Sequence, residues 1–170
     1  IPNPSLEPSQ IIEGKAKRTL ANRSMAEAVT YSFLSSQHAL LFGGGKDELK
    51  LMNPISSDLD EMRPSIIPNL ISSALKNSNM GNSDIAIFEV GPQYADASAE
   101  GQQVVAAGIR TGQTAARHWS TVSRSVDVFD VKGDVVALLE VLGVPVANLQ
   151  TSVDAPYWYH PGRSGALRLG

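Results

Sequence analysis

Apolar residues recur at every fourth position near the N-terminus and predict the first helix of the chain. The repeat runs through Ile12, Ala16 and Leu20, and this spacing places side chains on one face of an α-helix. We expect the helix to extend over Ser9–Asn22. The preceding residues, Ile1–Pro8, are rich in proline and predict an extended N-terminal segment.

A switch to alternating apolar and polar residues follows and is typical of a half-buried strand over Val29–Phe33. A short helix is predicted over Ser35–Leu41, and the three glycines of Gly43–Gly45 should end it. Leu49–Leu51 indicates a short strand, which the Asn-Pro pair at Asn53–Pro54 would stop.

A second stripe of apolar residues with helical spacing starts after Ser65, which we expect to be the N-cap of a helix. Pro68 then falls in the first turn, where its missing N–H removes no intrahelical hydrogen bond. The polar run Asn77–Ser83 predicts a turn or loop. The stripe consists of Ile66, Ile67, Leu70, Ile71, Ala74 and Leu75.

The C-terminal half contains both helical and strand-like patterns. A helix is predicted from Asp130 and should stop at Gly143, since Pro145 follows. Its apolar face is formed by Val131, Val135, Leu138, Leu139 and Leu142. Further strands are predicted at Ile85–Val90, Val104–Ile109, Leu149–Val153 and Ala166–Leu169.

The order of these elements indicates the α+β fold class. Strands follow strands without a regular crossover helix, so we expect a mostly antiparallel sheet. A chain of 170 residues is long enough for one domain with a hydrophobic core. We therefore predict a single domain over residues 1–170.

Composition narrows the class of function. The formal net charge of −3 argues against a dedicated nucleic-acid-binding surface. The chain has no cysteine, so disulfides, thiolate metal sites and a cysteine nucleophile are excluded. No apolar run approaches the roughly 20 residues of a membrane span. Because the chain runs from Ile1 to Gly170, inside a predicted strand, we expect it to be a piece of a longer protein.

Candidate catalytic and metal-binding residues are sparse. The histidines lack the spacing of metal ligands; they are His38, His118 and His160. An acidic cluster could hold a divalent ion, but a solvated cluster favoured by a helix dipole is the better interpretation. This cluster contains Asp58, Asp60 and Glu61. Neither Ser56–Ser57 nor Gly43–Gly45 has the context of a nucleophile elbow or a phosphate-binding loop.

Aromatic and basic residues gather in two places. Trp158 lies between two tyrosines shortly before Arg163; such a cluster can stack bases, but a core wall or a protein interface is more usual. Arg63 and Arg163 are each expected to pair with a carboxylate in a partly buried site. A basic run near the first helix is interpreted as a solvated face, with tRNA contact as the alternative. This run contains Lys15, Lys17, Arg18 and Arg23.

Several short motifs follow one another in an order that resembles one protein family. They are RTLANRSMAEAVTYSF at Arg18–Phe33, NPIS at Asn53–Ser56, MRPS at Met62–Ser65, FEVG at Phe88–Gly91, DVFDVKGDV at Asp127–Val135 and HPGRSG at His160–Gly165. The chain is similar to the catalytic-like module of the bacterial-type phenylalanyl-tRNA synthetase β subunit. It departs from the family at Ser24, where glycine is usual.

The resemblance implies a class II aminoacyl-tRNA synthetase-like antiparallel sheet flanked by helices, ending before the last strand and helix of that module. In this family an α2β2 heterotetramer attaches phenylalanine to tRNA(Phe) in the cytoplasm, using ATP and Mg²⁺, and the α subunit carries the catalytic site. The implied role of the module is non-catalytic: it packs against the α subunit and helps to build the tetramer. No membrane partner is implied.

The resemblance also implies that the adenylate site is missing. Class II enzymes hold the ATP α-phosphate with an arginine on the hairpin after a strand such as Ile85–Val90, because the phosphate charge requires stabilisation. That arginine position falls at Ala95 and a nearby glutamate position at Ala97, and a second family arginine is not found before Gly170. We therefore predict no catalytic, cofactor-binding or metal residue. A tRNA-contacting module and a free-standing nucleotide-binding enzyme on a synthetase-like fold remain as alternatives.

Overall fold

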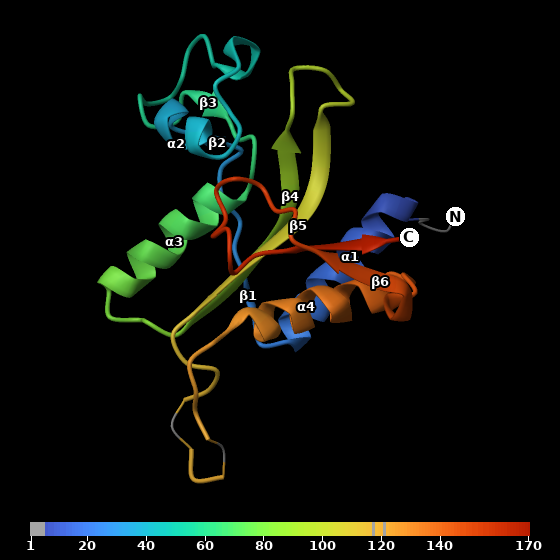
Figure 1. Ribbon diagram of the computed structural model, residues 1–170. Helices are drawn as coiled ribbons and strands as arrows, with labels where there is room; N and C mark the ends of the chain where they lie inside the picture. Colours follow the sequence, from blue (N-terminus) through green and yellow to red (C-terminus); the bar gives the residue numbers. More distant parts are fainter. Residues whose placement is uncertain (1–5, 117, 121) are drawn as a thin grey trace, which may run out of the picture. The chain divides into compact units, whose positions relative to one another are not determined.

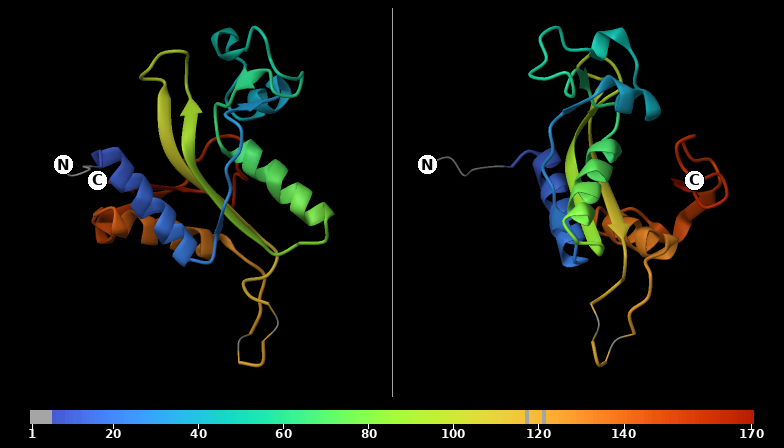
Figure 2. Two further views of the ribbon diagram at one scale, coloured as in Figure 1. Left: turned by 180° about the vertical axis from the view of Figure 1, so that it is seen from behind. Right: turned by 90° about the vertical axis from the view of Figure 1, so that its left-hand side faces the viewer.

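The computed structural model describes residues 6–116, 118–120 and 122–170, and it divides into two compact units. The first unit combines the residues up to Met25 with Asp127–Gly170, and the second is Ala26–Val126. Figure 1 colours the elements in chain order, and Figure 2 shows them from two other sides. The predicted extended segment Ile1–Pro8 lies outside the described residues as far as residue 5.

Two helices form the body of the first unit. α1 (Pro8–Asn22) and α4 (Val128–Val141) lie side by side, blue and orange in Figures 1 and 2. Ala16 and Leu20 of α1 are buried, as the four-residue repeat predicts. After α4, a short 3-10 helix, η2 (Val146–Asn148), leads into the antiparallel pair β6 (Leu149–Ser152) and β7 (Ala166–Leu169).

The ends of α4 follow from its capping residues. The Asp127 carboxylate accepts hydrogen bonds from the backbone N–H groups of Phe129 and Asp130, at 2.8 and 3.2 Å. The Asp130 carboxylate accepts one from Asp127 N in return, which completes a capping box. The helix therefore begins slightly earlier than predicted. Gly143, with φ of 86°, follows its C-cap and confirms the predicted stop.

A long antiparallel hairpin forms the centre of the second unit. β4 (Ile85–Tyr94) pairs with β5 (Gln102–Thr111) along its whole length, and β1 (Ala26–Glu27) adds a parallel edge to β4. Helix α3 (Ile67–Asn79) contacts both strands of the hairpin. Fully buried Phe88 of β4 belongs to a core that also contains Ile66, Leu70, Ala74 and Ile85.

The rest of this unit is a smaller subassembly. β2 (Phe33–Leu34) pairs antiparallel with β3 (Glu61–Met62), and α2 (Ser36–Leu41) follows β2 directly. A 3-10 helix, η1 (Asp47–Leu49), precedes the loop that leads to β3. Among the described strands, the only parallel pairing is β1 with β4. The expectation of a mostly antiparallel α+β fold is confirmed.

Two predicted strands are wrong. Of the predicted strand Val29–Phe33 only Phe33 lies in a strand, at the start of β2. Residues 28–32 belong to no sheet, because the Tyr31 carbonyl accepts side-chain hydrogen bonds from Asn69 and Arg63. Val29 and Tyr31 are 87% and 67% exposed, so the alternation does not mark a buried face. Leu49–Leu51 forms no named strand either: Leu49 ends η1, and Lys50 makes an isolated antiparallel bridge with Glu61.

The apolar stripe of α3 is buried on one side only. Ile66, Leu70 and Ala74 are buried, whereas Ile71 and Leu75 are 45% and 60% exposed. The N-cap of α3 is Ile66, one residue after the predicted Ser65. The Ser65 hydroxyl nevertheless accepts a hydrogen bond from Ile67 N in the first turn, at 3.2 Å. The helix extends to Asn79, so the predicted turn begins later than Asn77.

The apolar face of α4 is also more open than its pattern suggests. Val131 and Val135 are 42% and 38% exposed, and Asp134 is the buried residue of the helix. A search of the described residues finds no helix with the length and apolar character needed to cross a membrane.

Candidate functional site

The guanidinium of Arg63 is almost completely buried in the second unit. Its Nη2 lies 2.9 Å from Glu89 Oε1, and the two side chains are only 1% and 5% exposed. Its Nε donates to the Pro92 carbonyl at 2.7 Å, and its Nη1 donates to Thr30 Oγ1 at 2.8 Å. The expected pairing of Arg63 with a carboxylate is confirmed.

Thr30 and Gly91 complete this arrangement. The Thr30 hydroxyl donates to Glu89 Oε2 at 2.6 Å, so both carboxylate oxygens of Glu89 are satisfied. A Cβ added at Gly91 would lie 3.0 Å from Arg63 Nη2 and 3.3 Å from Glu89 Oε1, so a larger residue there would require these groups to shift. The network therefore holds the chain over 28–32 against β4 and is structural. Sequence analysis missed Thr30 and Glu89, although the FEVG motif contains Glu89.

The β4–β5 loop contains Ala95 and Ala97, the two positions at which the family resemblance predicts the loss of phosphate-binding residues. Ala95 and Ala97 are both exposed there. Between them, the Asp96 carboxylate accepts hydrogen bonds from the Ser98 hydroxyl and the Ser98 backbone N–H. These bonds lower the pKa of Asp96 below its usual value. The nearby ammonium group of Lys46 donates a hydrogen bond to the Ala95 carbonyl at 2.6 Å.

The acidic cluster is not the solvated group that the sequence predicts. Of its three carboxylates, that of Asp58 is exposed and has no hydrogen bond or ion pair among the described residues. Asp60 accepts hydrogen bonds from Ser36 N at 2.7 Å and Ser36 Oγ at 3.0 Å, and the backbone bond lowers the pKa of Asp60. Glu61 is fully buried on β3, where Oε1 accepts from Gly45 N at 2.8 Å. The Asp60 carboxylate therefore lies at the N-terminus of α2, which comes earlier in the chain, and not at the helix that follows the cluster.

The three histidines lie in separate places. His38 is on α2, whereas His118 and His160 are in loops, where their Nδ1 atoms lie within hydrogen-bonding distance of Ser120 Oγ and Gly162 N. In the part of the chain that the structure describes, no three histidine or acidic side chains are grouped as metal ligands.

The prediction for Arg163 is wrong. The residue is exposed in the turn between β6 and β7, where its backbone N–H donates to the His160 carbonyl at 3.1 Å. Its guanidinium forms no ion pair among the described residues. The neighbouring Tyr157 and Tyr159 are 74% and 44% exposed, so they form no core wall. An interface role for this aromatic cluster stays a prediction.

The basic run near α1 is partly neutralised. Lys17 Nζ lies 3.0 Å from Glu13 Oε1, one helical turn away. Arg23 pairs with the buried Asp134 of α4. Lys15 and Arg18 are exposed, as a solvated face requires.

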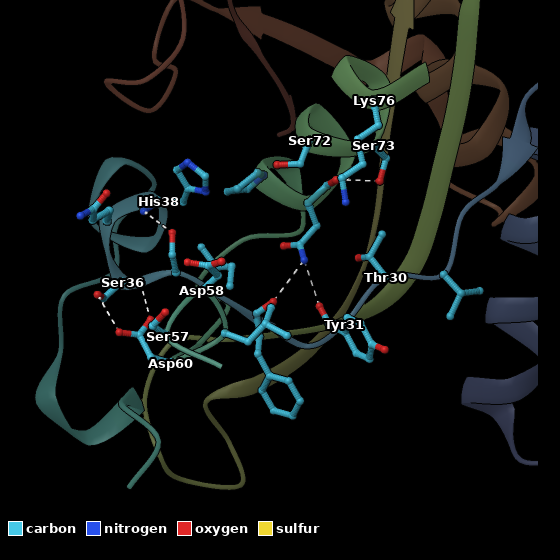
Figure 3. Close-up of a pocket in the computed structure, with 18 residues that line it drawn as sticks. Thr30, Tyr31, Ser36, His38, Ser57, Asp58, Asp60, Ser72, Ser73 and Lys76 are labelled. Atoms are coloured by element: carbon cyan, nitrogen blue, oxygen red, sulfur yellow. Dashed lines mark hydrogen bonds between the residues drawn. The ribbon is translucent and has the colours of Figure 1, made fainter. Parts of the chain in front are cut away.

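A large groove in the second unit was not predicted from the sequence. It has a volume of about 1090 Å³ and is lined by α3, by the start of α2 and by the chain around Tyr31 and Asp58. Figure 3 shows Lys76 and Ser72 of α3 at one side and Asp58 with Ser57 at the other. Asn69 on α3 also lines the groove, and this polar residue next to the apolar stripe is the signal that could have indicated it.

Comparison with known proteins gives consistent results. The profile of the family described as "Phenylalanyl tRNA synthetase beta chain CLM domain" matches residues 1–170. The phenylalanine–tRNA ligase β subunit of Rhodospirillum rubrum is 54% identical over 170 residues, which are 100% of this chain and 21% of the relative. That of Paramagnetospirillum magneticum is 48% identical, with the same coverage. The chain thus spans about a fifth of the length of these relatives.

Solved structures show the same type of fold. A pyrrolysyl-tRNA synthetase from Desulfitobacterium hafniense superposes with a TM-score of 0.55 over 88% of this chain and 49% of the other, at 12% identity. A second structure of a pyrrolysyl-tRNA synthetase from this organism gives 0.55 over 87% and 51%, at 13% identity. At this identity the likeness concerns the fold alone, which is that of a class II aminoacyl-tRNA synthetase.

Proposed function

Because the chain belongs to the phenylalanyl-tRNA synthetase β-chain family, in its CLM domain, we propose that it is a non-catalytic structural module. It packs against the catalytic α subunit of an α2β2 phenylalanine–tRNA ligase. The complete ligase makes Phe-tRNA from ATP, phenylalanine and tRNA(Phe) in the cytoplasm. We further propose that residues 1–170 act as one domain within the longer β chain.

The observation that carries the proposal is the β4–β5 loop. Phosphate activation requires positive groups aimed at the developing negative charge. At the corresponding positions this loop has the neutral Ala95 and Ala97, with the anionic Asp96 between them. The one cation described at this loop, Lys46, donates to the Ala95 carbonyl and is close enough to Asp96 to lower its pKa.

The residues of this chain therefore do not fit ATP with Mg²⁺. If the resemblance places the phosphate position correctly, the Asp96 carboxylate would lie beside it, and like charges repel. ATP and Mg²⁺ are therefore proposed to bind elsewhere in the holoenzyme.

Direct tRNA contact through α1 is not favoured by the charges. Lys17 and Arg23 are each paired with a carboxylate, so only part of the basic run is available to phosphates.

Assembly is tested by light-scattering chromatography of the 170-residue chain with and without its cognate α subunit, after circular dichroism has shown that the chain is folded. We expect a stable complex whose mass is the sum of both chains. A folded chain that elutes at its own mass in the presence of the α subunit would refute the assembly role for these residues.

Inactivity is tested by ATP–pyrophosphate exchange with phenylalanine. The chain alone should give background rates, while the α2β2 enzyme in the same buffer serves as the positive control. Exchange by the chain alone, abolished when the β4–β5 loop is replaced by a two-residue turn, would establish the free-standing enzyme instead.

A further inference from the structure

The chain that leaves β5 forms an arm of the second unit, residues 112–126. Its two sides are joined by backbone hydrogen bonds: Thr114 N donates to the Arg124 carbonyl at 2.8 Å, and Val126 N donates to the Gly112 carbonyl at 3.0 Å. Figure 1 shows the arm in yellow and orange, beyond the end of the β4–β5 hairpin. The arm is therefore a hydrogen-bonded ribbon and not an irregular loop.

Side-chain contacts fix the stem of the arm. The Asp84 carboxylate, just before β4, accepts a hydrogen bond from Gln113 N at 3.0 Å. Gln113 and Ser125 form an antiparallel bridge across the stem. Closer to the tip, the Ser123 hydroxyl donates to the Ala115 carbonyl at 2.8 Å. These contacts hold the arm at a defined place on the hairpin.

The tip presents an aromatic surface to solvent. The Trp119 side chain is 92% exposed, and the ring of the adjacent His118 lies 5.5 Å from it, tilted by 36°. Tryptophan is among the largest hydrophobic side chains, and most of its surface is normally buried in folded proteins. An indole that contacts so little of its own chain indicates a partner with a flat surface.

His118 adds a hydrogen-bond donor beside this indole. Its Nδ1 accepts the backbone N–H of Ser120 at 3.3 Å and lies 2.8 Å from the Ser120 hydroxyl oxygen. A nitrogen that accepts a hydrogen bond carries no proton, so the proton of the neutral ring is on Nε2. This N–H group has no partner among the described residues.

The charge of this region is of one sign. Between Glu100 and Asp127 the sequence has three arginines, one histidine and no acidic residue, whereas the whole chain has a net charge of −3. Arg124 is exposed on the arm, where its Nη1 donates to the Ser125 carbonyl at 2.9 Å. A positively charged segment on an otherwise acidic chain favours a polyanion as the partner.

Exposed aromatic rings next to positive groups are the means by which proteins bind unpaired nucleotides. We propose that the arm binds RNA: Trp119 stacks on an unpaired base, while His118 and Arg124 contact the adjoining phosphates. The inference rests on the proposed function, because this RNA is the tRNA of the complete phenylalanine–tRNA ligase. The contact is separate from α1, where part of the basic run is paired with carboxylates.

Cross-linking tests the contact directly in the α2β2 ligase with full-length β chains. p-Benzoylphenylalanine replaces Trp119, and the complex is irradiated in the presence of tRNA(Phe). We expect a cross-linked product that ribonuclease shortens, with the attached nucleotide in an unpaired region of the RNA. The same substitution at Tyr31, which is 67% exposed elsewhere in the second unit, is the control and should give no RNA product.

Substitutions measure the stacking. Trp119→Ala should weaken binding of tRNA(Phe) to the ligase about tenfold, as loss of one stacked base does. Trp119→Phe should retain most of the affinity, because a smaller aromatic ring still stacks. Val122→Ala removes an apolar side chain that is 90% exposed on the same arm and should change nothing. ATP–pyrophosphate exchange with phenylalanine, measured without tRNA, should be the same in each variant.

Salt dependence tests the phosphate contact. Arg124→Ala should reduce the slope of log Kd against log salt concentration by about 0.7, the value for one contact with a single strand. Arg124→Lys should keep the slope, because a point charge is sufficient for it.

Three results would overturn the proposal. They are RNA cross-links from position 119 that are absent or no more frequent than from position 31, an unchanged tRNA affinity of Trp119→Ala, and loss of the α2β2 complex in that variant. The last result would place Trp119 at a subunit contact. In the first two cases, light scattering that still gives the α2β2 mass leaves the assembly role standing.

Discussion

Two arginine–carboxylate pairs, one in each unit, differ in how completely protein groups replace water around them. The Arg63 and Glu89 side chains are 1% and 5% exposed, and the Arg63 guanidinium has further partners on Thr30 and Pro92. The Arg23 side chain is 37% exposed, whereas its partner Asp134 is 7% exposed. One pair is closed to solvent and the other is open on its cationic side.

The difference shows what a buried charge requires. Because Arg63 and Glu89 have both lost hydration, their stability depends entirely on the protein groups around them. Because the Arg23 side chain remains partly hydrated, its substitution should lower the free energy of unfolding by less than substitution of Arg63. The closed pair joins three segments that are far apart in the sequence, whereas the open pair joins the C-cap of α1 to α4.

The largest effect is expected for Arg63→Met. The substitution leaves the Glu89 charge buried without its cation, and it should destabilise the chain by about 3–5 kcal/mol. Urea denaturation followed by circular dichroism measures the change. The double variant Arg63→Met, Glu89→Leu should recover part of the loss, because an apolar pair needs no compensation. A loss below about 1 kcal/mol for the single variant would show that the pair behaves as an exposed one.

Gly91→Ala tests how tightly the closed pair is packed. The new Cβ would lie 3.0 Å from Arg63 Nη2, and we expect a loss of about 1–3 kcal/mol in the free energy of unfolding. Gly162→Ala is the matched control, since its Cβ would approach His160 no closer than 3.6 Å. In an Arg63→Met background the Gly91→Ala penalty should shrink; an unchanged penalty would mean that the obstruction is not the guanidinium.

Arg23→Ala breaks the open pair. Asp134 remains buried but can recruit water at the site that Arg23 vacates, so we expect a loss of about 1–2 kcal/mol. Arg18→Ala, at an exposed position of the same helix, controls for the loss of a surface cation. Equal losses from the two variants, measured in the same urea titration, would remove the distinction between an open pair and a solvated charge.

Asp60 extends the comparison to a carboxylate held without any arginine. Hydrogen bonding from Ser36 makes the folded-state pKa of Asp60 lower than its unfolded value. Its contribution to stability is therefore present above about pH 4 and is lost as the pH falls through the folded pKa. We expect Asp60→Asn to lower Tm at pH 7 and to approach the wild-type Tm at pH 3. A Tm difference that persists at pH 3 would contradict this, and Asp58→Asn is the control.

Sequence patterns predicted those elements whose stability depends on local chemistry. The fold around α3 followed from a serine cap, a proline in the first turn and an apolar stripe, and the strands at Ile85 and Val104 followed from short apolar runs. These signals lie within a few residues of the structure that they specify.

The failures involve partners that are distant in the sequence. Val29–Phe33 alternates as a strand does, but the Tyr31 carbonyl accepts hydrogen bonds from the side chains of Arg63 and Asn69. In the sequence Glu61 resembles a surface carboxylate, but in the structure it accepts a hydrogen bond from the distant Gly45 N. Arg63 and Arg163 occur in similar proline-containing motifs, and only the tertiary fold determines that one is buried and the other is exposed.

The close approach of Gly91 to Arg63 also constrains how the sequence can diverge. A Cβ at position 91 would require the Arg63 guanidinium to shift, and a smaller residue at 63 would leave Glu89 without its cation. The effect of a substitution at one of these positions is thus expected to depend on the residues at the other two. Positions 63, 89 and 91 are therefore expected to be replaced together, as an epistatic set, even where no catalytic demand acts on them.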